Sequence, residues 1–392
     1  MNSPLISDLT ANQIALTVIL LLLGANLIAN LRMVARATPT AVSSPPLEMV
    51  SVLVPARNEA RNIRRCLRSL LAQDCPQMEV LVLDDDSTDA TPEIVAEMAR
   101  LDPRLRLIRG QSLPQGWMGK NFACHQLARL AQGKWFLFTD ADTVHQPGAL
   151  SWAIAAARHN GSDLVTLIPR AVTHTFGEQL VLPIIPFGLL GCFPLAVGAR
   201  WRIPFLTMAL GPYMLFRREA YFRAGGHEAV RGEIAEDVAL ARQMTRSGGR
   251  VTLLDGSEQV DVHFYHGFRE SWRGLTKSAF AALGYRLLPS LLMVAAYGFL
   301  FLWPTWLLLT GLWQGRMGEP TLRLALFQVF LNSSLWYAVA TRFRLPRSTA
   351  LFYPLTILLV ILIMLDSIRM AAFSGIGWKE RVYRVRSGSL RH

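Results

Sequence analysis

The chain has 392 residues, 52% of them hydrophobic and 17% charged, with a formal net charge of +12 at pH 7. This composition is too apolar for an ordinary soluble protein, and the basic residues crowd beside apolar segments, which favours membrane phosphates over nucleic acid as the counter-charge. The four cysteines, Cys66, Cys75, Cys124 and Cys192, are scattered without close pairs, which argues against a disulfide framework or a zinc site and favours a reducing compartment.

A first apolar segment runs from Gln13 to Leu31 without a charge, and Arg32 and Arg36 follow it directly. This length is sufficient to span a bilayer. A cleaved signal peptide carries its positive charge before the apolar core, which is the reverse of the order here. Because basic residues prefer the cytoplasmic side, we expect residues 1–36 to form a membrane anchor whose trailing end is cytoplasmic.

After a Ser43–Pro46 linker, short apolar runs alternate with helix-like periodicity. The predicted strands cover residues 50–54, 80–83, 105–108, 135–139 and 164–168. Asn58 is a candidate cap for the helix after the first strand, and Thr91-Pro92-Glu93 has the residue order of a helix start. Alternating strands and helices predict an α/β fold with a mostly parallel sheet flanked by helices, in a cytoplasmic domain of residues 37–285.

An apolar stretch at residues 180–199 contains Pro183, Pro186 and Pro194 as well as three glycines. So many helix breakers argue against a plain spanning helix. The sequence leaves open whether this segment lies in the membrane interface or is buried in a core.

Three further apolar segments, at residues 287–313, 322–341 and 350–373, predict C-terminal membrane helices within residues 286–373. The middle segment is interrupted by Asn332, and the last carries Asp366, which we place near the interface beside Arg369. A basic tail follows at residues 374–392. With one anchor and three further spans, the chain would end on the outside, where it began. A basic tail prefers the cytoplasm, so the sequence leaves open whether one of the segments is re-entrant.

Polar groups follow three of the predicted strands where these end. They are Pro55-Ala56-Arg57-Asn58-Glu59, then Asp84-Asp85-Asp86-Ser87, and Asp140-Ala141-Asp142. Each group alone is explained by turn formation. Ligands of parallel α/β sheets bind beyond the carboxyl ends of strands, so the shared placement of the three groups predicts a binding site.

Asp140 and Asp142 can present two carboxylates to one hard cation, with phosphate oxygens completing its coordination, which suits Mg²⁺ or Mn²⁺. Such an ion would act as a Lewis acid that stabilises charge on a leaving diphosphate. A dinucleotide-binding turn is not predicted, because Pro55-Ala56-Arg57 supplies no glycine-rich loop after the first strand.

Glu236 and Asp237 open a short predicted helix that closes at Gly248-Gly249. Two explanations fit the position of these acids equally well. Either they complement the helix dipole, or one of them acts as general base for an acceptor hydroxyl. Lys120 is either a solvated lysine at a helix start or a partner for a donor phosphate, and we favour the phosphate.

These ordered motifs resemble the inverting glycosyltransferases of family 2, which have the GT-A fold, over residues 48–285. The resemblance implies that Arg57, Glu59 and Asp85, beside Pro55 and Asp84, hold the nucleoside of a nucleotide-sugar. It further implies that Asp140 contacts the sugar or ribose, that Asp142 and Asp140 bind the metal, and that Asp237 beside Glu236 is the base. Asp86 stands where the family often has glycine.

Finer motifs point to one branch of that family. Residues 116–120, 211–218 and 225–227 are similar to those of membrane-bound hopanoid-associated or carotenoid glycosyltransferases, and more distantly to ceramide glucosyltransferases. Their tail resembles residues 378–383 here, although Glu380 replaces a usual glycine.

Trp272 and Arg273 resemble residues of the segment that covers the donor in this family, and an amphipathic interfacial helix is the alternative. Processive synthases carry a Gln-x-x-Arg-Trp element there, which this chain lacks. His263 and His266 are not expected to bind a metal without a third ligand. By resemblance, His266 approaches the diphosphate.

The resemblance implies an integral protein of the inner or plasma membrane, with its catalytic domain in the cytoplasm. It would transfer one sugar from a nucleotide-sugar, with a UDP-sugar favoured, to a lipid acceptor. Two alternatives stay open: a processive polysaccharide synthase, and a non-catalytic membrane scaffold that retains a sugar-nucleotide domain.

Overall fold

The computed structural model describes residues 4–38, 48–316, 318–373, 376–378 and 381–383. The chain divides into two compact units, which are described separately. The first contains a β-sheet and comprises residues 32–172 and 195–264. The second is helical and comprises residues 1–31, 173–194 and 265–385. The predicted linker at Ser43–Pro46 lies outside the described residues.

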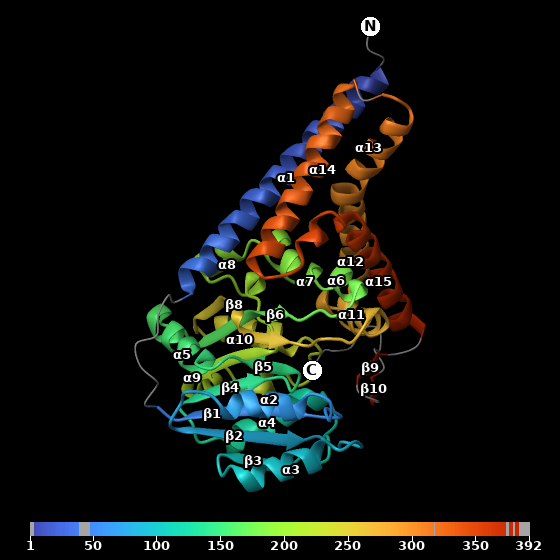
Figure 1. The fold of residues 1–392 in the computed structure, drawn as a ribbon. Coiled ribbons are helices and arrows are strands. Elements are labelled where there is room, and N and C mark those ends of the chain that lie inside the picture. The colour runs from blue at the N-terminus through green and yellow to red at the C-terminus, as the bar shows by residue number, and fades with distance from the viewer. Residues whose placement is uncertain (1–3, 39–47, 317, 374–375, 379–380, 384–392) are drawn as a thin grey trace. The chain divides into compact units, whose positions relative to one another are not determined.

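The sheet unit is built on eight strands in the order β3-β2-β1-β4-β7-β6-β8-β5 (Figure 1). The strands are β1 Val50–Ala56, β2 Met78–Asp84, β3 Leu105–Arg109, β4 Trp135–Thr139, β5 Thr143–His145, β6 Leu164–Ala171, β7 Tyr213–Arg217 and β8 Val251–Val262. The first four strands run parallel, whereas β7 is antiparallel to both of its neighbours, β4 and β6. The predicted α/β fold with flanking helices is confirmed, and its sheet is mixed.

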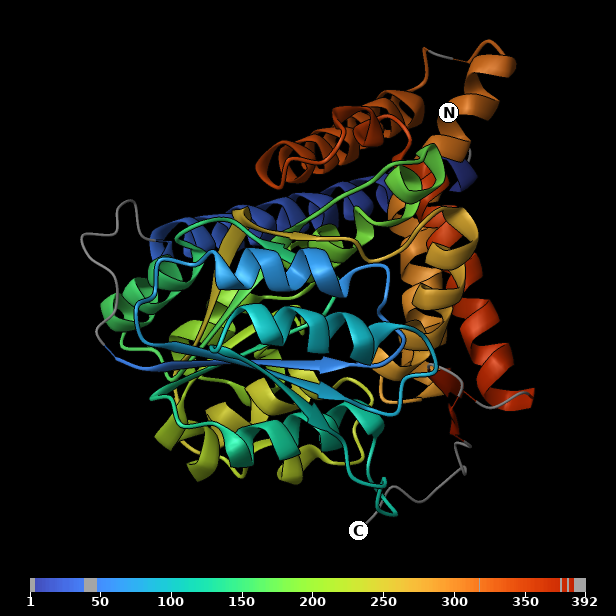
Figure 2. The ribbon, with the colours of Figure 1, turned by 60° about the horizontal axis from the view of Figure 1, so that its bottom comes forward.

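Helices cover both faces of this sheet (Figure 2). They are α2 Ile63–Leu71, α3 Thr91–Leu101, α4 Gly119–Leu130, α5 Ala149–Asn160, α9 Arg218–Arg223 and α10 Glu236–Arg246, and the unit also contains α8 Leu195–Trp201. Because successive strand residues point to opposite faces, Val52 packs in the core with α2, α3 and α5, and Leu53 packs in the core with α4 and α10. Burial on both sides explains why β1 and β2 are nearly continuous apolar runs.

The helical unit consists mainly of long apolar helices. Its helices are α1 Pro4–Ala37, α6 Phe176–Val181, α7 Ile184–Phe187, α11 Phe268–Ala282, α12 Leu287–Tyr297, α13 Trp303–Trp313, α14 Pro320–Arg342 and α15 Tyr353–Phe373, and two short strands follow, β9 Ile376–Trp378 and β10 Arg381–Tyr383. Four helical stretches, Ala11–Ala37, Leu287–Trp313, Pro320–Arg342 and Tyr353–Ala372, are long and apolar enough to cross a membrane, or five if residues 176–192 and 195–201 count as one span. These four match the predicted anchor and C-terminal spans.

The breakers in residues 180–199 divide this stretch into α6, α7, a π-helical turn at Gly188–Cys192 and α8. Asn26 and Asn30 on α1 satisfy the carbonyls that the irregular backbone exposes. The Nδ2 atom of Asn30 donates to the carbonyls of Leu190 and Phe193, at 2.7 Å each. Irregular backbone among apolar helices requires such partners, because lipid offers none. An interfacial position for this segment stays a prediction.

Candidate active site

The first two polar motifs form one interlocked loop pair after β1 and β2. Arg57 is buried, and its guanidinium donates to the backbone carbonyl of Asp85 at 2.5 Å. The Asp85 amide in turn donates to the carbonyl of Ala56 at 2.8 Å. Asp84 and Asp85 are buried as well, so the predicted nucleoside-binding residues do lie together at one edge of the sheet.

Asn58 does not cap α2 as predicted, because that helix begins five residues later, at Ile63. Asn58 instead adopts a left-handed backbone with φ of 52°, and its side-chain oxygen accepts from the Thr88 amide at 2.8 Å. Helix α3 begins at Thr91, as predicted, and the Thr91 amide donates to Oδ1 of Asp89 at 3.0 Å. The Glu59 amide donates to Thr91 Oγ1 at 2.8 Å, which fixes the first motif against α3.

Asp86 occupies the position where the resembling family often has glycine. Its φ of 60° lies in the left-handed region, which glycine favours and which aspartate tolerates better than most residues. The turn therefore keeps its conformation without the glycine.

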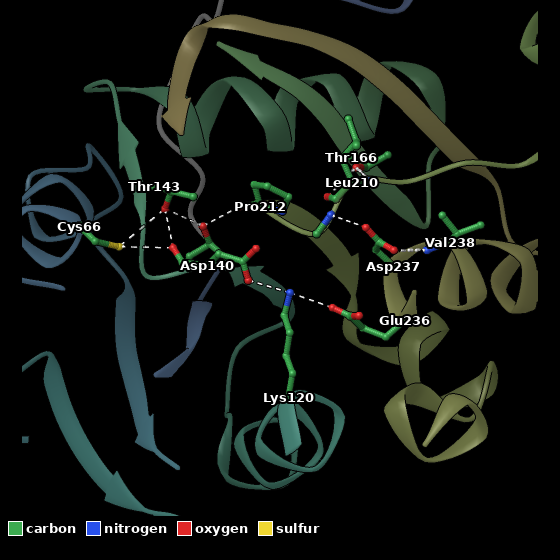
Figure 3. A network of polar contacts seen from close by, with 12 residues as sticks. Cys66, Lys120, Asp140, Thr143, Thr166, Leu210, Pro212, Glu236, Asp237 and Val238 are labelled. Atoms are coloured by element: carbon green, nitrogen blue, oxygen red, sulfur yellow. Dashed lines mark hydrogen bonds and ion pairs between the residues drawn. The ribbon is translucent and has the colours of Figure 1, made fainter. Parts of the chain in front are cut away.

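Lys120, at the start of α4, links two of the predicted acids (Figure 3). Its Nζ lies 2.8 Å from Asp140 Oδ1 and 2.8 Å from Glu236 Oε1. Burial by itself would lower the pKa of the Lys120 ammonium, but the negative charges of Asp140 and Glu236 outweigh it and hold that pKa well above its usual range. Lys120 is therefore a fixed positive charge inside the site, and its predicted contact with a phosphate stays a prediction.

Asp237 follows Glu236 in the first turn of α10, and both its carboxylate oxygens accept backbone hydrogen bonds (Figure 3). Oδ2 accepts from the Gly211 amide at 2.9 Å, and Oδ1 accepts from the Val238 amide at 2.7 Å. Burial raises the pKa of Asp237 to about 6, and the charge of Glu236 adds to the shift while Lys120 and the two amides oppose it. A carboxylate in this range can accept a proton near neutral pH.

Gly211 lies where these charged groups converge. A Cβ on this residue would be 3.2 Å from Lys120 Nζ, 3.5 Å from Asp237 Oδ2 and 3.7 Å from Asp140 Oδ2. The missing side chain therefore leaves room between an ammonium and two carboxylates. In the sequence, Gly211 stands out only as the first residue of the motif at 211–218, and no local pattern indicates that it lies beside these charges.

Hydrogen bonds from buried threonine side chains fix the turn between β4 and β5, which carries Asp140 and Asp142. The hydroxyl of Thr143 donates to the carbonyl of Asp140 at 2.8 Å, and the hydroxyl of Thr139 donates to the carbonyl of Pro212 at 2.7 Å. Burial lowers the pKa of His145, which contacts both threonines, to about 3, so the imidazole is neutral. Asp142 is half-buried in the same turn, and its carbonyl accepts from the His263 amide at 3.2 Å.

The acids of this region suit a hard cation, although no three histidine, cysteine or acidic side chains form a metal-ligand group among the described residues. Mg²⁺ and Mn²⁺ commonly take one or two carboxylates and complete their shell with substrate phosphates and water. The ammonium between Asp140 and Glu236 shows that this part of the site already holds one positive charge. The carboxylates of Asp140 and Asp142 are ligands of the kind that such an ion takes together with substrate phosphates, and metal binding by them stays a prediction.

Cys66 lies beneath the same turn but is no candidate nucleophile. Its Sγ is 3.7 Å from the Asp140 carbonyl. Burial, with added repulsion from Asp142, Glu59 and Asp140, raises the pKa of the Cys66 thiol to about 12. A thiol that stays protonated is a poor nucleophile.

Trp272 and Arg273 belong to α11 of the helical unit. The indole Nε1 of Trp272 donates to Asp366 Oδ2 at 3.0 Å, and Arg273 is exposed. Arg369 pairs with the same Asp366 at 2.7 Å, as the sequence suggested. The predicted contact of Trp272 and Arg273 with the donor stays a prediction.

Comparison with known proteins agrees with the motifs. Residues 51–222 match the family model described as glycosyl transferase family 2. The 4,4'-diaponeurosporenoate glycosyltransferase of Staphylococcus haemolyticus strain JCSC1435 is 28% identical over 233 residues, which cover 59% of this chain and 60% of the relative. The enzyme of the same name from Staphylococcus aureus strain USA300 is 29% identical, over 58% of this chain and 60% of its own length. The chain thus matches about three-fifths of these relatives.

A solved structure has the same fold. The mannosyltransferase PcManGT from Pyrobaculum calidifontis, in complex with GDP-Man and Mn²⁺, superposes with a TM-score of 0.53 at 21% identity, covering 93% of this chain and 99% of that one. At this identity the likeness shows the fold alone. Residues 51–222 thus match glycosyl transferase family 2 and lie in a sheet unit of the GT-A fold, and the chain also has helices long and apolar enough to span a membrane.

Proposed function

We propose that this chain is an inverting glycosyltransferase that moves one sugar from a nucleotide-sugar to the hydroxyl of a membrane lipid. The observation that carries the proposal is the convergence of Asp140, Lys120 and Asp237 on the open side of Gly211. The match to family 2 supports a nucleotide-sugar as the donor. The helices long enough to span a membrane support a lipid as the acceptor.

In the proposed reaction, the loop pair of Arg57, Asp84 and Asp85 binds the nucleoside. Asp140 and Asp142 would hold Mg²⁺ or Mn²⁺, which when bound neutralises charge on the departing diphosphate. Lys120 adds a fixed positive charge beside Asp140, where the phosphates would lie.

Asp237 is the proposed general base. The oxygen of the acceptor hydroxyl bonds to carbon-one of the sugar as the bond from that carbon to the diphosphate oxygen breaks, and Asp237 takes the hydroxyl proton. Direct displacement inverts carbon-one and needs no covalent enzyme intermediate. The two backbone amides hold the carboxylate in one orientation for this transfer.

The identities of donor and acceptor are narrower parts of the proposal. The curated relatives are named for 4,4'-diaponeurosporenoate, and the structural neighbour is described with GDP-Man. We propose a carotenoid or similarly apolar lipid as acceptor. For the donor we propose a nucleoside-diphosphate sugar, and the predicted UDP-sugar is to be compared directly with GDP-mannose.

The test compares lipid extracts of cells that express the chain, the Asp142→Asn variant or neither, by mass spectrometry. The chain should add lipids heavier by one sugar, and Asp142→Asn should add almost none. Glu93→Gln is the matched control, since it removes an exposed acid from the same domain. Unchanged lipids, a ladder of longer glycans, or full activity of Asp142→Asn would contradict the proposal.

A further inference from the structure

The sheet unit carries an exposed aromatic corner, residues 197–206, which the proposed function does not use. We name it the Trp201–Phe205 corner. Trp201 is 70% exposed, Phe205 is 68% exposed and Val197 is 42% exposed. Large aromatic side chains that cluster in water mark surfaces that bind a partner, and tryptophan is enriched at membrane–water boundaries.

The corner is tightly built. Helix α8 ends at Trp201 because Arg202 takes a left-handed backbone with φ of 53°, and the Ile203 amide then donates to the Gly198 carbonyl at 3.0 Å. A 3₁₀ turn follows at Pro204–Leu206. A Cβ on Gly198 would lie 2.6 Å from Leu206 Cβ, so the two segments pack in close contact. The exposed aromatic side chains are therefore held on an ordered turn.

Positive charge surrounds these aromatic groups. Arg200 and Arg202 flank Trp201 and are exposed, and Arg242 on α10 stacks over the Phe205 ring with its Cζ 5.3 Å from the ring centroid. Arg246 lies one turn further along α10 and is exposed. The ion pairs found among the described residues include none of these four arginines.

The electrostatics of Arg242 agree with an excess of positive charge. Burial and then the charge of Arg246 lower the pKa of Arg242, and Glu233 opposes them. The Nε atom of Arg242 is buried and has no hydrogen-bond partner in the described part of the chain. An anion at this surface would relieve the repulsion between the two arginines.

We propose that the Trp201–Phe205 corner, together with Arg242 and Arg246, binds anionic phospholipid headgroups at the membrane–water boundary. At such a boundary the aromatic rings can contact the apolar part of the lipids, while the arginines beside them bind the anionic headgroups. A second copy of this chain fits less well, because a two-fold contact would place the same positive corner against itself.

Headgroup binding at this corner would act on the helix that carries Asp237. Thr207 Oγ1 lies 3.1 Å from Thr245 Oγ1 of α10, which fastens the end of the corner to that helix. The chain continues from Thr207 to Gly211, whose amide binds Asp237. The corner is therefore attached to the last turn of α10, whose first turn carries Asp237. Lipid binding at the corner can be tested without measuring any activity.

The experiment uses the full chain in nanodiscs, with Cys192→Ser to remove the half-buried thiol and Val197→Cys to attach an environment-sensitive fluorophore. Nitroxide-labelled lipid serves as the quencher. In discs of phosphatidylcholine with phosphatidylglycerol, the fluorophore should shift to the blue and be quenched, and in phosphatidylcholine alone it should be quenched much less. A fluorophore at Leu101→Cys, a residue of α3 that is 81% exposed, should stay in water in both.

Two further variants test the contributing groups. Arg242→Gln with Arg246→Gln should require about tenfold more phosphatidylglycerol for the same quenching, since two cations are removed from an anionic surface. Trp201→Ser should reduce quenching at any composition. The matched control, Arg100→Gln with Arg129→Gln, removes arginines from the last turns of α3 and α4 and should change neither.

Three results would overturn the proposal. The first is absence of quenching in every disc, and the second is quenching that does not depend on phosphatidylglycerol. The third is a blue shift in detergent that grows with protein concentration, which would identify a second copy as the occupant.

Discussion

Asp237 combines a raised pKa with a fixed orientation, and the pH dependence of transfer follows from both. As the general base, it must be deprotonated, and burial raises its pKa to about 6. We therefore expect the turnover rate to be constant above about pH 7 and to fall roughly tenfold for each pH unit below 6. Initial rates at saturating donor between pH 4.5 and 8 would check this, and a rate that is flat to pH 4.5 would exclude Asp237 as the base.

Gly211 is the residue whose lack of a side chain matters most to the proposed site. Gly211→Ala would place a methyl group 3.2 Å from Lys120 Nζ and 3.5 Å from Asp237 Oδ2. Displacement of these groups by even 1 Å should lower turnover by about 100-fold, while binding of the nucleoside, for which we propose Arg57, should change little.

Turnover and nucleotide affinity, measured side by side, test this expectation for Gly211→Ala. Gly298→Ala is the control, because a methyl group there meets nothing within 4 Å. Wild-type turnover in Gly211→Ala would show that the open space is not used.

Helix α1 is held to the π-helical turn by buried amide side chains. Asn30→Ala would leave the carbonyls of Leu190 and Phe193 without the two 2.7 Å hydrogen bonds that they accept. Loss of buried partners should lower the free energy of unfolding by about 1–3 kcal/mol.

Thermal unfolding in detergent would measure the effect of Asn30→Ala. Leu22→Ala on the same helix, whose side chain is 65% exposed, should change the unfolding temperature far less. Equal stability of the two variants would mean that these hydrogen bonds contribute nothing to holding α1.

The sequence predicted the helices and strands that can be identified from the pattern of neighbouring residues alone. The strands at Val50–Val54 and Trp135–Thr139 are apolar on both faces, and the helix start at Glu236 follows from its acids and periodicity. Strands β5, β7 and β8 of the sheet were not predicted. The antiparallel pairing of Tyr213–Arg217 with β4 and β6 depends on contacts distant in sequence.

The site was predicted as separate acids, and the structure adds how they are joined. No local pattern indicates that Lys120 bridges Asp140 and Glu236, because the three residues come from elements far apart in the chain. The predicted capping role of Asn58 is wrong for a similar reason. The side-chain oxygen of Asn58 accepts from the Thr88 amide of the loop after β2, and sequence order does not show this contact.

For the molecule as a whole, the proposal requires a divalent ion that only two carboxylates of the protein would hold. Weak protein ligation implies that chelation removes the ion readily. We expect EDTA to lower transfer by at least about 100-fold, and Mn²⁺ or Mg²⁺ to restore it, as measured by initial rates in nanodiscs. Unfolding temperature should stay the same, because no described element depends on the ion. Full activity in excess chelator would show that transfer needs no metal.

The most direct test of the proposed mechanism is single-sugar transfer by purified Asp237→Asn in nanodiscs at saturating donor, with nucleotide binding measured on the same sample. Removing the base should lower turnover by about 10²- to 10⁴-fold, while the affinity for the nucleotide stays within a few-fold of wild type. Turnover equal to wild type, or a loss fully explained by weaker nucleotide binding, would contradict a catalytic role for Asp237.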